Sequence, residues 1–188
     1  MQKTKWQHKL FYKHGLMKLM NEQKNIAVEE LIHKMADDLA KTIDLEHVEL
    51  IGIQTGGMLV ANEIGKIIKH PRKIGSLNIS FYRDDYTRNG LHPQVTPSNL
   101  PFDVENKTII LIDDVLFSGR TIRAALNEIF DYGRPTKVIL MILANREEHE
   151  LPIAPDIFTA SATKRGNVSR LNIYIIKVDW LAIISFPP

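Results

Sequence analysis

Thr108-Ile-Ile-Leu-Ile-Asp-Asp-Val-Leu-Phe-Ser-Gly-Arg-Thr121 decides the fold of this chain. Its four consecutive apolar residues, 109–112, predict a strand that is buried on both faces, as in a parallel sheet. Asp113 and Asp114 stand at the carboxyl end of that strand. A short loop, 115–120, comes next, and Thr121 begins a helical pattern of apolar residues.

This order of strand, acid pair, loop and helix is suited to a phosphorylated sugar. The backbone N–H groups of the loop and of the first helical turn can donate to a phosphate. The two carboxylates then remain for ribose hydroxyls and a divalent metal. An acid pair alone is also typical of a solvated turn, but the Ser-Gly-Arg-Thr that follows it after three residues favours a binding site.

The composition is that of one globular domain. The chain has 188 residues, of which 44% are hydrophobic and 24% charged, with a formal net charge of +2. This charge is too small to indicate a nucleic-acid partner by itself. The absence of cysteine excludes disulfides, thiolate nucleophiles and zinc–thiolate sites. No apolar run approaches the length of a membrane span, and we expect a cytoplasmic enzyme without a membrane partner.

Two parts are predicted along the chain. Residues 1–24 form a basic N-terminal extension, which is either a loosely packed or disordered arm or a basic helix that touches RNA or a membrane surface. Residues 25–188 form the enzyme domain. Asn25 is expected to cap an amphipathic helix whose apolar residues, from Val28 to Ile43, recur at helical spacing.

A second strand–loop–helix unit precedes the first in the chain. Residues 48–53 predict a strand, Gln54-Thr55-Gly56-Gly57 ends it, and a helix is expected over 58–68. Two adjacent glycines at a strand end permit a close approach of a ligand to the backbone. A plain turn is the alternative, but a second phosphate loop on the neighbouring strand favours the binding site.

Strands and loops account for the rest of the chain. Residues 77–82 alternate as a strand closed by Arg83, Asp84 and Asp85, and the proline-containing residues 86–104 are interpreted as a mobile lid. Further strands are predicted at 137–144, 157–159, 171–178 and 180–186. The alternation of strands and helices predicts an α/β fold: a doubly wound, mainly parallel sheet flanked by helices, with a small cap and the lid.

Several motifs of the chain resemble one family. The stretch 108–121 is similar to the PRPP-binding signature of the type I phosphoribosyltransferases. Beyond that, residues 23 to about 160 resemble the pyrimidine operon attenuator PyrR family, regulators with uracil phosphoribosyltransferase activity. The shared motifs are Leu-Ile-Gly-Ile-x-Thr-x-Gly (50–57), Tyr-Arg-Asp-Asp (82–85), Ile-Asp-Asp-Val-Leu-Phe-Ser-Gly-Arg-Thr-Ile-Arg-Ala-Ala (112–125), Gly-Arg-Pro (133–135) and Glu-Leu-Pro-Ile (150–153).

The resemblance implies a role for each matching residue. Asp113 and Asp114 are expected to hold the ribose hydroxyls of PRPP and, through these or through water, the cofactor Mg²⁺. Arg83 is expected to act with them in catalysis and, with Asp84, to begin the lid. Pyrophosphate is expected at Thr55, Gly56 and Gly57. The 5-phosphate and the remainder of the substrates are expected at Leu116, Phe117, Ser118, Gly119, Arg120, Thr121 and Arg146.

The choice of base depends on Phe117. Purine-type relatives place an acid at this position, three residues after the second carboxylate, to manage a proton at purine N7. An aromatic side chain cannot act as a general base, so the resemblance implies a pyrimidine, with uracil converted to UMP and pyrophosphate. A phosphoribosyltransferase for another base is an alternative. Arg146 either orients a carbonyl of the base or is a surface arginine, and no general base is assigned.

Two departures from the family pattern lie where the family contacts pyrophosphate and RNA. Gln54 stands where the family commonly has a basic residue, which removes one charge near pyrophosphate. In residues 145–154, Glu147 and Glu148 replace residues of the family's RNA-binding surface and oppose RNA phosphates. An enzyme is therefore expected first, and a UMP-responsive RNA-binding regulator with weak catalysis is the alternative. The resemblance also implies a homodimer or a larger homo-oligomer.

Overall fold

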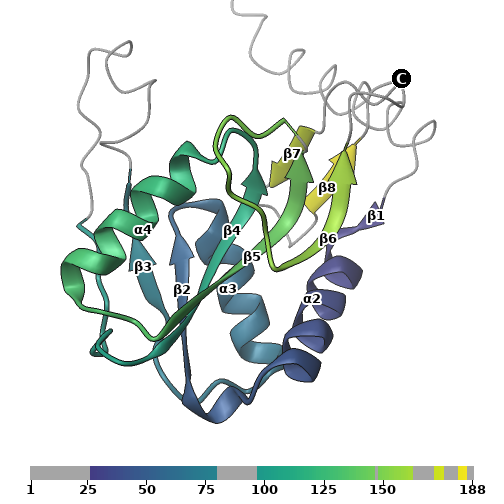
Figure 1. Cartoon of the computed structure of the whole chain (residues 1–188). Helices are drawn as coiled ribbons and strands as arrows, with labels where there is room; N and C mark the ends of the chain where they lie inside the picture. The colour runs from purple at the N-terminus through teal and green to yellow at the C-terminus, as the bar shows by residue number, and fades with distance from the viewer. Residues whose placement is uncertain (1–25, 80–96, 147, 163–171, 176–181, 186–188) are drawn as a thin grey trace, which may run out of the picture.

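The computed structural model describes residues 26–79, 97–146, 148–162, 172–175 and 182–185 (Figure 1). Its centre is a parallel sheet of five strands in the order β3-β2-β4-β5-β6. The strands are β2 (Val48–Ile53), β3 (Gly75–Leu77), β4 (Thr108–Leu116), β5 (Lys137–Arg146) and β6 (Ile157–Ala162). The chain goes from β2 to β3 on one side and then returns to β4 on the other, so the predicted doubly wound sheet is confirmed.

The strands are apolar because both faces of the sheet are covered. On β4, Ile110 and Ile112 belong to the core on one face, while Ile109 and Leu111 belong to the core on the other, and all four are fully buried. Alternation of side chains along a strand explains this division. The run of apolar residues that predicted a doubly buried strand is therefore what the architecture requires.

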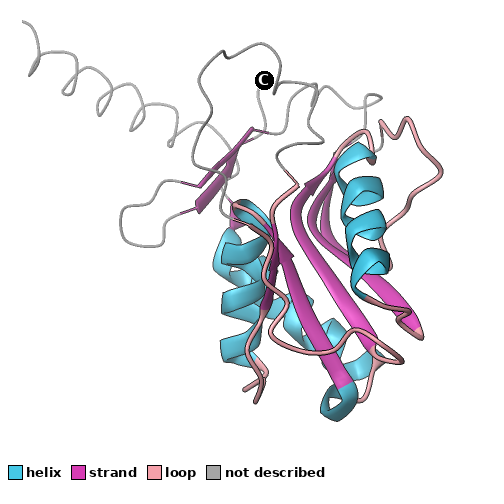
Figure 2. Cartoon of the chain, turned by 90° about the vertical axis from the view of Figure 1, so that its left-hand side faces the viewer, coloured by secondary structure: helices cyan, strands magenta, loops and turns pink. Residues whose placement is uncertain are grey.

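Helices cover both faces of the sheet (Figure 2). The helices α2 (Val28–Thr42) and α3 (Gly56–Ile67) pack on one face, and α4 (Arg120–Tyr132) packs on the other. A 3₁₀ turn, η1 (Leu45–His47), leads from α2 into β2. In the part of the chain that the structure describes, no helix has the length and apolarity needed to cross a membrane.

A second, smaller sheet is appended to this core. It is antiparallel, with the order β1 (Ile26–Ala27), β8 (Ala182–Ser185) and β7 (Asn172–Ile175). It corresponds to the small cap that the sequence predicted. Residues Ile26 and Ala27 form β1, and helix α2 begins directly after them at Val28. The expected cap, Asn25, lies outside the described residues.

Several predicted boundaries differ from the structure. A strand was predicted at 77–82, but β3 covers Gly75–Leu77 and the chain has left the sheet at residues 78–79. Strand β4 continues through the acid pair to Leu116 because Val115 and Leu116 still pair with β5, so the loop before α4 is shorter than predicted. Helix α3 already begins at Gly56. The end of the predicted lid packs on the domain: Asn99 pairs with Ser76 by two backbone hydrogen bonds of 2.8 Å. Residues 80–96 of the predicted strand and lid lie outside the described residues.

Candidate functional site

The candidate site lies where the winding of the sheet reverses. Strands β2 and β4 are neighbours, with Gly52 opposite Ile112, and the chain leaves β2 toward β3 on one side and β4 toward β5 on the other. In doubly wound sheets, ligands bind in the crevice beyond the carboxyl ends of such strands. The loops after β2 and β4 are the two segments that the sequence selected, and the fold brings them to one place.

The two loops are in direct contact through glycines. A β-carbon at Gly56 would overlap the carboxylate of Asp114, with Oδ1 3.0 Å away and Oδ2 closer still. A β-carbon at Gly57 would collide with the carbonyl oxygen of Ile112 and would lie 2.9 Å from the Cα of Asp113. Any other residue would hold the start of α3 away from β4. The glycine pair therefore allows the two halves of the site to meet, which the sequence alone did not show.

Main-chain N–H groups orient the two carboxylates. The N–H of Asp114 donates to Asp113 Oδ1 at 3.0 Å, and the N–H of Val115 donates to Asp114 Oδ1 at 2.9 Å. Asp113 is 6% exposed and Asp114 is half-buried. Adjacent carboxylate oxygens are the hard ligands that Mg²⁺ prefers, usually together with waters and substrate oxygens. The donor set therefore fits the metal that the sequence analysis assigned to Asp113 and Asp114.

The segment from Phe117 to Thr121 forms the beginning of α4. Gly119 is at the N-cap with φ 88°, a left-handed conformation that other residues rarely adopt. The N–H of Arg120 donates to Ser118 Oγ at 3.3 Å, which shapes the turn. The first N–H groups of a helix have no partner within the helix and attract anions. This turn into a helix N-terminus is the feature on which the expectation of a phosphate site was based.

Leu116 is buried in the domain, unlike the exposed Phe117 that follows it. Its side chain is 1% exposed and belongs to the core under α4. Leu116 also pairs with Asn145 of β5, so in this structure the residue serves packing and the sheet.

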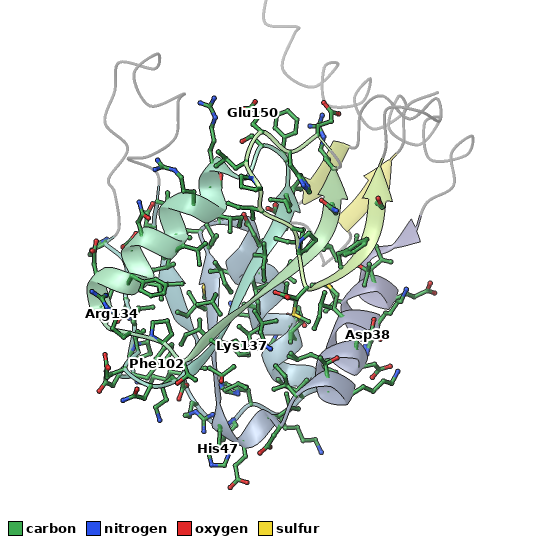
Figure 3. The ribbon with its side chains drawn as sticks, in the orientation of Figure 1. Asp38, His47, Phe102, Arg134, Lys137 and Glu150 are labelled. Atoms are coloured by element: carbon green, nitrogen blue, oxygen red, sulfur yellow. The ribbon has the colours of Figure 1, made fainter. Side chains whose placement is uncertain are left out.

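A segment after β5 supports the turn that leads into α4. The carbonyl oxygen of Ser118 accepts hydrogen bonds from the N–H groups of Glu150, at 3.1 Å, and Leu151, at 3.2 Å. Arg120 forms an ion pair with Glu150 at 2.9 Å, and Figure 3 shows Glu150 at the upper end of the molecule. Leu151 and Ile153 pack against Gly119. The sequence analysis missed this support because nothing near residue 118 indicates a partner so far along the chain.

Phe117 and Arg146 form an aromatic–cation pair beside the turn that leads into α4. The guanidinium carbon of Arg146 lies 4.1 Å from the centroid of the Phe117 ring, and Phe117 is 42% exposed. Arg146 Nη2 donates to Glu148 Oε1 at 3.2 Å. Such a stack is stabilised by the ring quadrupole and fixes the plane of the guanidinium. Two residues that the sequence placed separately near the base are thus in contact with each other.

Not every predicted residue can be located. Arg83 and Asp84 lie outside the described residues. Thr55 is at the N-cap of α3 without a side-chain capping bond, and the peptide bond between Gln54 and Thr55 is cis. The described residues therefore bring together the two loops, the acid pair and the Phe117–Arg146 stack.

Comparison with known proteins is consistent with this site. Residues 21–169 match the family model of the phosphoribosyl transferase domain. The Bifunctional protein PyrR of Pseudomonas savastanoi pv. phaseolicola (strain 1448A / Race 6) is 51% identical over 135 residues, which cover 70% of this chain and 79% of that protein. The Bifunctional protein PyrR of Pseudomonas paraeruginosa (strain DSM 24068 / PA7) is 52% identical over 131 residues, 68% of this chain and 77% of that protein.

Solved structures show the same fold at low identity. A hypoxanthine phosphoribosyltransferase from Staphylococcus aureus superposes with a TM-score of 0.64 and 17% identity, covering 90% of this chain and 96% of that one. A purine phosphoribosyltransferase from Pyrococcus horikoshii Ot3 gives a TM-score of 0.56 at 22% identity, covering 72% of this chain and 82% of that one. Likeness at such identities concerns the fold and carries no information about the base.

Proposed function

The chain belongs to the type I phosphoribosyltransferases and is PyrR-like, and from that premise we propose that it transfers the ribose 5-phosphate of PRPP to uracil. The observation that carries this proposal is the contact of Gly56 and Gly57 with Asp113 and Asp114. This contact supports the proposal because a backbone loop that could accept pyrophosphate lies against carboxylates that could hold the ribose. The products are UMP and pyrophosphate.

The reaction needs positioning and electrostatics more than it needs a nucleophilic side chain. A nitrogen of the base forms a bond to C1 of the ribose, the bond from C1 to the pyrophosphate oxygen breaks, and the proton of the base nitrogen passes to solvent. The start of α4 would hold the 5-phosphate, and the N–H groups at the start of α3 would stabilise the charge on the leaving pyrophosphate. Asp113 and Asp114 would fix the ribose so that C1 faces the base.

Magnesium fits the same carboxylates. Asp113 and Asp114 would hold Mg²⁺ directly or through water and the ribose hydroxyls, and the ion would neutralise charge on the pyrophosphate. The backbone N–H groups of Asp114 and Val115 keep the two carboxylates in place for this task.

Phe117 and Arg146 support a pyrimidine. In the purine-type relatives, an acid at the position of Phe117 manages a proton at purine N7, and a phenyl ring has no proton to exchange. The stack on Phe117 fixes the Arg146 guanidinium, which would donate to a carbonyl oxygen of the base. Uracil has two such oxygens. The proposal for uracil depends on these two residues and on the PyrR relatives, whereas the reaction class depends on the acid pair and the loops.

A base panel tests the proposal. Purified protein, Mg²⁺, PRPP and one labelled base at a time are incubated, and nucleotide formation is measured by chromatography. We expect UMP from uracil and no nucleotide from hypoxanthine or guanine. Asp114→Asn should lower the rate by at least about a hundredfold, while Asp131→Asn, an exposed carboxylate at the far end of α4, should leave it unchanged. Product from a purine, or full activity in Asp114→Asn, would contradict the assignment.

RNA binding is a second candidate function, favoured by the kinship to proteins named bifunctional. Glu148 would oppose RNA phosphates, but its ion pair with Arg146 offsets part of that charge. Titration of a pyrimidine leader RNA at two salt concentrations, with and without UMP, separates the candidates. We expect a weak RNA affinity that falls steeply as the salt concentration rises and is the same with and without UMP. Tight, UMP-dependent binding would establish the regulator instead.

A further inference from the structure

A cleft of about 580 Å³ lies at the opposite end of α3 from the candidate active site. It is formed by the last two turns of α3 and by the segment that leads to β3. Helix α3 has 12 residues, so its two ends are about 18 Å apart. His47, at the lower end of the molecule in Figure 3, marks this edge of the sheet, and Glu150 marks the other. The residues that line the cleft are Asn62, Gly65, Lys66, Lys69, His70, Arg72 and Ile74.

The charged side chains that line the cleft are all positive. Three are cations, Lys66, Lys69 and Arg72, and no acid is among the described residues of the lining. Arg72 is fixed in place, since Nε donates to the buried Glu49 at 3.0 Å and Nη2 donates to two main-chain carbonyl oxygens. Lys66 is paired with Glu63, whereas Lys69 is exposed and forms no ion pair with any residue that the structure describes. Among the described residues, Lys69 is therefore the cation of the lining whose charge no acid offsets.

Lys69 has a backbone conformation that favours glycine. Its φ is 53°, its N–H donates to the carbonyl oxygen of Lys66, and the N–H of His70 donates to that of Gly65. This is the Schellman ending of a helix, in which the left-handed residue is usually glycine. A lysine there costs about 1 kcal/mol relative to glycine. A strained residue at a cleft is a reason to look for a task of its side chain.

His70 adds an unsatisfied polar group beside the same cleft. Both ring nitrogens are buried and have no hydrogen-bond partner among the described residues. Buried polar atoms without partners are uncommon in folded proteins and call for a missing partner. Burial and the adjacent Arg72 lower the pKa of His70, although Glu49 opposes them. The lowered pKa favours the neutral ring, in which one nitrogen can donate and the other can accept.

We propose that this cleft is a second ligand site, which binds the polyphosphate group of a small molecule such as a nucleoside triphosphate. The volume is in the range of small-molecule sites. Lys66, Lys69 and Arg72 would contact the phosphate oxygens, as cations do in phosphate sites. A small turn of the His70 ring would give one nitrogen a phosphate partner. The site is separate from the acid pair and does not depend on which base the enzyme uses.

Nuclear magnetic resonance of the full chain tests the site. The probes are inorganic triphosphate and ATP, both without Mg²⁺, and the readouts are the backbone amides of Gly65 and His70. We expect saturable shifts at both amides with each probe. Tighter binding of ATP would assign the site to nucleotides, and equal affinity would assign it to the polyphosphate alone. The absence of saturable shifts up to about 10 mM, or shifts confined to Gly56 and Gly119, would overturn the proposal.

Two variants separate binding from folding. Lys69→Gly removes the cation and relieves the left-handed strain, so it should raise the thermal midpoint while it weakens triphosphate binding about tenfold. Lys73→Gln removes an exposed charge of the same segment that does not line the cleft, and it should change neither property by a comparable amount. Unchanged triphosphate affinity in Lys69→Gly would overturn the proposal that this cleft is the binding site.

Discussion

Replacement of Gly57 by alanine is the sharpest test of how the candidate active site is built. The new β-carbon would collide with the carbonyl oxygen of Ile112 and with the Cα of Asp113, which would be 2.9 Å away. Both neighbours are backbone atoms of a central strand, so they cannot rotate aside. To restore ordinary contact distances, the start of α3 has to move by about 1 Å relative to β4.

The size of the effect follows from this displacement. Overpacking of this kind costs about 1–3 kcal/mol, and the better helix propensity of alanine returns up to about 1 kcal/mol. We therefore expect the free energy of unfolding of Gly57→Ala to fall by roughly 1–2 kcal/mol. A misplacement of about 1 Å between the two halves of the site should also lower kcat/KM for PRPP about a hundredfold.

Gly65→Ala is the matched control in the same helix. Its β-carbon would lie 2.8 Å from Cδ1 of Ile74, the far end of a flexible side chain. The gain in helix propensity offsets this contact, so stability should stay within about 1 kcal/mol and activity should not change. Urea unfolding and initial rates of UMP formation at varied PRPP give both numbers. Wild-type stability and rates in Gly57→Ala would refute the claim that the glycine lets the two loops meet.

Three further changes test other contacts of the domain. Arg72→Ala leaves the carboxylate of Glu49, 4% exposed, without its charged partner, and should lower the free energy of unfolding by roughly 3–5 kcal/mol in urea melts. Because folding lowers the pKa of His70 from 6.5, the unfolded chain binds a proton that the folded chain does not, so stability should fall as the pH drops through 6.5. That slope should be smaller in His70→Asn than in the wild type or in His33→Asn, which alters an exposed side chain. Gly119→Ala forces a β-carbon into a left-handed conformation and should cost about 1–2 kcal/mol, measured by thermal unfolding, whereas no loss would mean that the turn can rearrange.

Much of the fold could be predicted because local signals agree with global packing. The mainly apolar segments 48–53 and 109–112 lie in strands that are covered on both faces, and each strand is followed by a turn that leads to a helix. Alternating strands and helices admit few topologies other than a parallel sheet. The acid pair and the glycine pair were selected from residue type and order, and the fold brings these two pairs into contact.

The rest depends on contacts between residues far apart in the sequence. The bonds from Glu150 and Leu151 to the carbonyl of Ser118 cannot be read from either segment alone. The strand boundary at Leu116 was missed because the acidic residues that usually end a strand are here paired within a sheet. The cation cleft at the end of α3 combines a helix terminus with the following segment, and its lysines look like ordinary surface residues in the sequence.

The pairing of β2 with β4 has a further consequence for the order of folding. These neighbours in the sheet are separated by a long stretch of chain that includes β3. Closing so long a loop costs entropy before the contacts form, and such non-local pairings slow folding. Gly56 and Gly57 follow β2, whereas Asp113 and Asp114 lie on β4. The two halves of the candidate site therefore come together only when these two strands pair. A ligand that touches both halves consequently opposes the unfolding of the entire sheet rather than the opening of a single loop.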